Sequence, residues 1–185
     1  MTGQVLVAGV GNIFLGDDGF GVEVAKRLAT ADLPSWVQVA DYGISGMHLA
    51  YDLAGGYETA ILIDTARRGE RPGTLTVIEA GRPEETGAVA ESRLFDAHGM
   101  QPDVVLGVLE MLGAASARVL VVGCEPASLD YGMELSEPVA AAVGEAVRVV
   151  IRLIAEIGAD AAIAASSNAA RSSGEGALYV PRHTR

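Results

Sequence analysis

The chain has 185 residues, half of them hydrophobic, with 13 basic against 24 acidic side chains and a formal net charge of −11. This length suits one globular domain with a sizeable core, and the acidic balance argues against nucleic acid and anionic membranes as partners, since both require a basic footprint. Cys124 is the single cysteine, which excludes an internal disulfide. Because no signal-peptide pattern precedes the first strand pattern, we expect a cytoplasmic protein.

The first third of the chain predicts alternating strands and helices. Strands are expected over residues 4–9, 36–42 and 59–63, the last ending at Asp64. Helices are expected over residues 20–30 and from a cap at Ser45 to Gly55–Gly56, because apolar residues recur there at helical spacing. This strand–helix order predicts a parallel sheet with right-handed crossovers.

The remaining elements complete a three-layer α/β fold. Residues 65–73 are too few for a parallel crossover, so the strand at 74–79 is expected to run antiparallel to its predecessor, at the far edge of the sheet. A helix from Pro102 to Gly113, a parallel strand over 117–123 and a helix from an N-cap at Ser136 to Gly158 follow. We therefore predict a mostly parallel, twisted sheet of about five strands with one antiparallel strand and helices on both faces.

The domain is expected to span residues 1–158, and residues 159–185, rich in Ala, Ser, Asn and Gly, are expected to form a flexible tail. The most apolar long run, 138–157, carries charges three or four residues apart. That spacing predicts an amphipathic helix and not a membrane span.

Three metal-binding side chains are expected at one edge of this sheet. Asp18 follows the first strand, Asp64 ends the third, and the long connection over residues 80–100 must return to the same edge, which delivers His98 there. Two carboxylates and an imidazole can bind a divalent transition metal. Taken singly, Asp18 could instead cap the following helix, and Asp64 could be a turn residue.

Two further interpretations stay open at this edge. Cys124 follows a strand there and is either a nucleophile near His98 or a small buried residue. The glycines of the first motif fit part of a dinucleotide-binding fingerprint, but its third glycine position is Phe14, and Asp17–Asp18 would repel a pyrophosphate. Asp41, after the second strand, stands where a ribose-binding acid would lie.

Over residues 4–155 the sequence resembles the endopeptidases that mature nickel–iron hydrogenases. The markers are GVGNIFLGDDGFG, DYGISGMHLAYDL, ILIDTARRGERPG, DAHGMQPDVVL and VVGCEPASLDYGMELS, in this order. The resemblance implies that Asp18, Asp64 and His98 are the metal ligands and catalytic residues. Some relatives carry glutamate where this chain has Asp18, and Asp17 is a neighbouring acid that could share the role.

The resemblance also implies a substrate and a metal. Such endopeptidases remove the C-terminal extension of the hydrogenase large-subunit precursor after nickel insertion, and the nickel belongs to the substrate; another divalent metal such as zinc could occupy the isolated protein. The catalytic class stays open between a metal-activated water and an aspartate acting as general base. The alternative is a non-catalytic nucleotide- or metal-sensing α/β domain.

Overall fold

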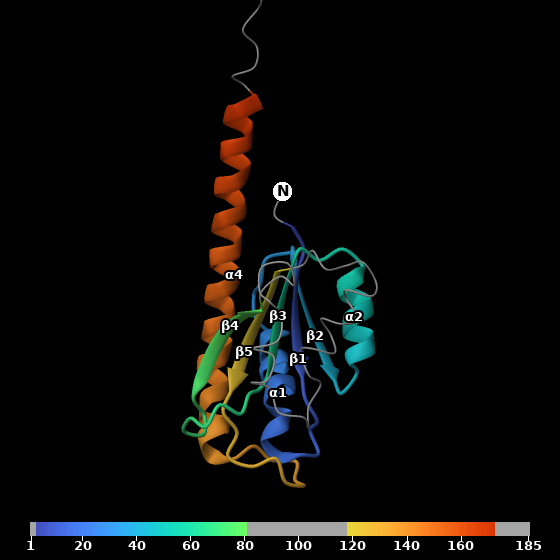
Figure 1. The fold of residues 1–185 in the computed structure, drawn as a ribbon, viewed down its shortest axis with the longest axis vertical. Coiled ribbons are helices and arrows are strands. Elements are labelled where there is room, and N and C mark those ends of the chain that lie inside the picture. Colours follow the sequence, from blue (N-terminus) through green and yellow to red (C-terminus); the bar gives the residue numbers. More distant parts are fainter. Residues whose placement is uncertain (1–2, 81–117, 173–185) are drawn as a thin grey trace, which may run out of the picture.

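A computed structural model describes residues 3–80 and 118–172, and its centre is a five-stranded sheet (Figure 1). The strands lie in the order β2-β1-β3-β5-β4. Their bounds are β1 Val5–Val10, β2 Val37–Gly43, β3 Thr59–Thr65, β4 Leu75–Ala80 and β5 Arg118–Cys124. All neighbouring pairs are parallel except β4 with β5, where Val77 faces Val122 in an antiparallel register. The antiparallel edge strand predicted from the short connection is therefore confirmed.

Helices cover both faces of the sheet, as predicted (Figure 1). The described helices are the short 3-10 helix η1 (Gly16–Gly19), α1 (Phe20–Leu28), α2 (Gly46–Ala54) and α4 (Glu137–Ser172). The helix expected from Pro102 to Gly113 lies outside the described residues. Within the described ranges no helix combines the length and the hydropathy that a bilayer crossing requires.

Two apolar clusters separate the three layers. On one face α1 and α4 contribute Phe20, Leu28, Val143 and Val150 to a cluster with Val5, Val7, Ile61, Ile63 and Val122 of the strands. On the other face Leu49 and Leu53 of α2 pack on the alternate strand residues, among them Leu6, Ala8, Leu62 and Val121. The inner strands β1 and β3 are thus buried on both faces, which explains the continuous apolar runs over residues 5–10 and 60–63.

The last helix extends further than the sequence indicated. It was expected to end at Gly158, but α4 continues to Ser172 and rises well beyond the sheet (Figure 1). Gly158 lies within the helix and faces Trp36: a Cβ at this position would lie 3.2 Å from the Trp36 ring. Half of the residues from 159 to 172 are alanine, the best helix former. Gly158 therefore marks a close contact and not a helix end.

Candidate active site at the carboxyl edge of the sheet

Two loops lie side by side where the parallel strands end. The first loop (residues 11–18) follows β1, and the second loop (residues 125–136) follows β5. They exchange backbone hydrogen bonds: Gly16 N–H donates to the carbonyl of Gly132 (2.8 Å), and Gly132 N–H donates to that of Phe14 (3.0 Å). Segments more than 110 residues apart in sequence thereby form one surface.

Asp17 joins these loops from the inside. Its side chain is 1 % exposed, and its carboxylate accepts four hydrogen bonds. The donors are Ala127 N (2.7 Å), Ser128 N (3.0 Å), Ser136 N (2.6 Å) and Ser136 Oγ (2.9 Å). Ser136 directly precedes α4, as predicted, and its hydroxyl donates to Asp17. Asp17 therefore fixes the second loop and the start of α4.

Asp18 points to a different neighbour from Asp17. It is also buried, and its two carboxylate oxygens accept from Asn12 N (2.7 Å) and from Thr65 Oγ (3.1 Å). The N-cap of α1 is Gly19, with no side-chain cap bond, so the helix-capping interpretation of Asp18 is wrong. The carboxylate instead faces the end of β3.

Asp64 lies close to Asp18, near the end of β3, the strand next to β1. Thr65 bridges the pair, since its backbone N–H donates to Asp64 Oδ1 (2.6 Å) while its hydroxyl donates to Asp18. Gly11, with φ +129°, also separates them: a Cβ there would collide with the Asp18 carbonyl oxygen and lie 3.6 Å from Asp64 Oδ1. Only glycine permits this approach.

Asp18 and Asp64 are two buried acids whose negative charges would repel each other. Burial, and then the negative charge of Asp18, raise the pKa of Asp64 from 3.8 to about 8, although hydrogen bonds from Thr65 partly oppose this. The ion pairs within the described residues lie on other surfaces, and none involves Asp17, Asp18 or Asp64. The two carboxylates therefore share a buried position that a cation would stabilise.

The third predicted ligand, His98, lies outside the described residues. Among residues 3–80 and 118–172, no group of three His, Cys, Asp or Glu side chains is arranged to hold a metal ion. The structure thus brings together Asp18 and Asp64 as predicted. The role of His98 stays a prediction.

The first loop is a poor cradle for a phosphate. Its amide groups already donate within the protein: of residues 11–18, only Ile13 has no such bond. Asn12 N–H, for example, donates to Asp18. A pyrophosphate needs free amides at such a turn, so the geometry argues against the nucleotide-binding interpretation.

Cys124 belongs to the core. It is fully buried among the side chains packed beneath α1 and α4, and burial together with the charges of Asp17 and Glu125 raises its pKa to about 12. A thiol that stays protonated is a weak nucleophile. Of the two interpretations, the small buried residue fits the structure.

Sequence reasoning missed Glu125, the next residue along the chain. It is 8 % exposed, and its Oε2 accepts a hydrogen bond from Arg68 N (2.6 Å) in the connection between β3 and β4. A signal was available: Glu125 follows a parallel strand at the same edge as Asp18 and Asp64. Its partner could not be deduced, since residues 66–73 have no periodic pattern.

Comparison with known proteins shows the family to which this chain belongs. A family profile described as hydrogenase maturation protease matches residues 22–153. The hydrogenase expression/formation protein HupD of Rhodobacter capsulatus is 34 % identical over 151 residues, which cover 78 % of this chain and 70 % of HupD. The hydrogenase 2 maturation protease of Escherichia coli is 30 % identical over 159 residues, which cover 85 % of this chain and 94 % of that protease.

Solved structures give the same result. The hydrogenase maturating endopeptidase HybD from Escherichia coli superposes with a TM-score of 0.69 at 28 % identity, covering 84 % of this chain and 94 % of HybD. A hydrogenase 2 maturation peptidase from a Thaumarchaeota archaeon gives a TM-score of 0.65 at 34 % identity, covering 82 % of this chain and 98 % of that peptidase. The predicted α/β fold is confirmed by these neighbours, and the chain belongs to the hydrogenase maturation protease family.

Proposed function

We propose that this protein is a cytoplasmic endopeptidase that removes the C-terminal extension of a nickel–iron hydrogenase large-subunit precursor after nickel insertion. The observation that carries the proposal is the buried Asp18–Asp64 pair at the carboxyl edge, in a chain of this family. Nickel enters as part of the substrate. Asp18 and Asp64 are the residues that meet it, with His98 as the third ligand.

The surface around the pair suits a protein substrate. Large apolar side chains are exposed on the segments that follow the strands at this edge: Phe14 on the first loop, Ile44 after β2, Met47 at the start of α2, and Tyr131 and Met133 on the second loop. Tyr131 is 95 % exposed. Apolar side chains gathered around a polar site are typical of protein–protein contacts, so a folded precursor can rest on this rim.

The chemistry needs one group to bind the cation and one to move a proton. With a cation present, Asp64 gives up the proton that burial otherwise favours, because the positive charge offsets the repulsion from Asp18. The freed carboxylate then serves as ligand or as general base for an attacking water. Thr65 orients both carboxylates, because its backbone N–H donates to Asp64 and its hydroxyl donates to Asp18.

The test is processing of a purified precursor followed by mass spectrometry of the large subunit. Asp18→Asn, Asp64→Asn and His98→Ala should each lower the rate at least about 100-fold while the proteins stay folded. Asp130→Asn is the control, because Asp130 is an exposed acid on the second loop that bonds to Ser128. Processing at the wild-type rate by folded Asp64→Asn would refute the assignment.

The role of nickel is tested with two precursors at equal concentration. Precursor loaded with nickel should be shortened, and nickel-free precursor should stay intact. Equal cleavage of both would refute substrate-borne nickel as the signal. Activity lost on chelation and restored only by zinc would instead assign Asp18, Asp64 and His98 to a resident metal site.

A further inference from the structure

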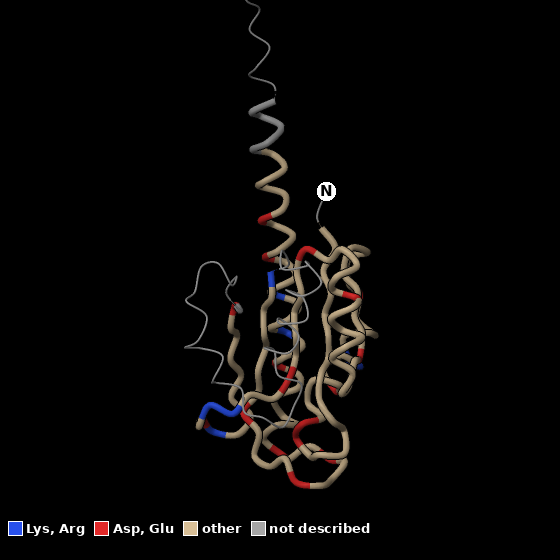
Figure 2. The backbone as a smooth tube through the Cα atoms, turned by 45° about the vertical axis from the view of Figure 1, so that its right-hand side comes forward, with Lys and Arg blue, Asp and Glu red and all other residues tan. Residues whose placement is uncertain are grey.

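The connection between β3 and β4 carries three arginines with no acidic partner. This arginine loop (residues 66–73, ARRGERPG) contains Arg67, Arg68 and Arg71, all exposed. Within the described part of the chain none of the three side chains takes part in an ion pair or hydrogen bond. Figure 2 shows the loop as a basic segment beside the acidic residues of neighbouring loops.

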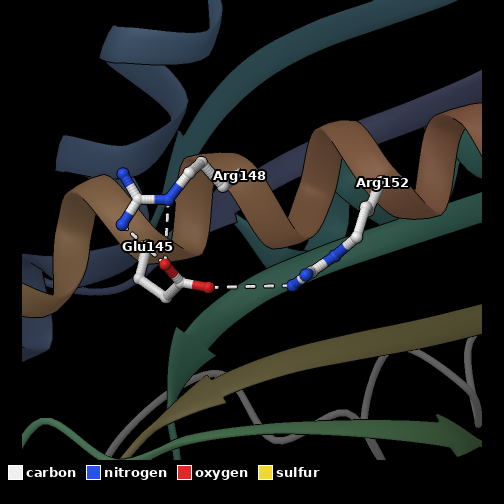
Figure 3. Close-up of polar contacts among 3 residues, drawn as sticks. All are labelled: Glu145, Arg148 and Arg152. Carbon is white, nitrogen blue, oxygen red and sulfur yellow. Dashed lines mark hydrogen bonds and ion pairs between the residues drawn. The ribbon is translucent and has the colours of Figure 1, made fainter.

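Four other arginines with described side chains are paired with glutamate. Arg27 meets Glu23 at 3.3 Å, and Arg118 meets Glu79 at 2.8 Å. On α4, Arg148 and Arg152 share Glu145, at 2.6 Å and 3.7 Å (Figure 3). In a chain of net charge −11, acidic partners are abundant. Three arginines within residues 67–71 that lack such an ion pair, with Glu70 as the single acid in the segment, therefore form a distinct feature of net positive charge.

The backbone of the arginine loop is held in place at several points. Arg68 N–H donates to the buried carboxylate of Glu125 (2.6 Å), Gly73 N–H donates to the Glu125 carbonyl (2.8 Å), and Ala66 N–H donates to the carbonyl of Cys124 (2.8 Å). The loop thus presents its charges from a fixed base. A preformed site loses less conformational entropy on binding than a mobile one.

The position of the arginine loop links it to the active site. Arg67 stands three residues after Asp64, so their Cα atoms are separated by at most about 11 Å. A chain lying over Asp18 and Asp64 passes within reach of a guanidinium group. The arginine fork matches a carboxylate with two parallel hydrogen bonds.

We infer that the arginine loop is a docking site for an acidic segment of the large-subunit precursor. The inference rests on the proposed function and adds to it the chemistry of the contact. The rest of this acidic protein repels such a segment, so the arginine loop determines where the segment binds. It thereby sets the orientation of the precursor over the carboxylate pair.

The experiment compares two triple variants with the same loss of charge. R67Q/R68Q/R71Q removes the arginine loop's charges, and R27Q/R148Q/R152Q removes three exposed charges from α1 and α4. With nickel-loaded precursor, the loop variant should raise KM about tenfold at low ionic strength, with kcat within about twofold of wild type. The control variant should keep the wild-type KM, and urea unfolding checks that both are folded.

A second arm separates this inference from the proposed function. Fluorescence anisotropy with a labelled deca-glutamate peptide at low salt should show binding to wild type and to the control variant, and none to the loop variant; deca-glutamine should not bind. This result requires no processing activity. Equal KM values or equal deca-glutamate binding for the two variants would overturn the inference. Dimerisation of wild type that only the loop variant abolishes would overturn it too, by assigning the loop to a second copy of the chain.

Discussion

Replacing Asp17 should cost more stability than replacing either carboxylate of the Asp18–Asp64 pair. Its four accepted hydrogen bonds come from donors in the second loop and at the start of α4. At about 1 kcal/mol for each bond, Asp17→Ala should lower the free energy of unfolding by about 4 kcal/mol. Ser136→Ala, which removes only the hydroxyl donor, should cost about 1 kcal/mol.

Urea unfolding followed by Trp36 fluorescence measures the difference. With a slope of about 2 kcal/mol per molar, the Asp17→Ala midpoint should fall by about 2 M. Asp130→Ala is the control, since it removes an exposed carboxylate from the second loop, the loop that Asp17 fixes, and should shift the midpoint little. A loss below about 1 kcal/mol for Asp17→Ala would refute the reasoning, because it would mean that the buried donors find other partners.

The remaining predictions concern ionisation and packing. Because the pKa of Asp64 rises from 3.8 to about 8 on folding, the folded protein holds a proton that the unfolded chain has lost, and stability should fall as pH rises through this window. Asp64→Asn should flatten that slope and stabilise the metal-free protein at pH 8 by up to about 5 kcal/mol, as measured by urea unfolding; an unchanged slope would contradict the pKa shift. Cys124 should react with a thiol reagent only after denaturation, and rapid labelling of native protein would contradict its burial. Truncation after Ala155 should red-shift Trp36 emission by removing the helix turn at Gly158, whereas truncation after Ser172 should not.

Much of the fold could be predicted because its signals are local. The apolar runs of β1 and β3 and the short connection before β4 determine a parallel sheet with one reversed edge strand. The same topology brings Asp18 and Asp64 to one edge. These inferences need only strand order and direction, which the sequence carries in its pattern of apolar and turn residues.

The errors arose where a distant residue decides the outcome. The propensity of Gly158 alone predicts a helix end, but the absence of a side chain there allows close contact with Trp36, more than 120 residues earlier. Asp17 was considered as a companion of Asp18 at the metal, yet its donors lie 110 to 119 residues away in sequence. No periodicity links such positions, so only the folded arrangement reveals them.

The sharing of Asp17 between two distant loops has a consequence for how the protein is made. During synthesis β1, β2 and β3 can assemble early, but β5 must enter between β3 and β4 before β4 has any neighbour in the sheet. Asp17 meets its last donor only when Ser136 has emerged from the ribosome. Until then a buried carboxylate without partners opposes closure of the edge. The candidate site is therefore completed by the last third of the chain, and we expect a nascent or truncated molecule that ends before Ser136 to lack the assembled carboxyl edge.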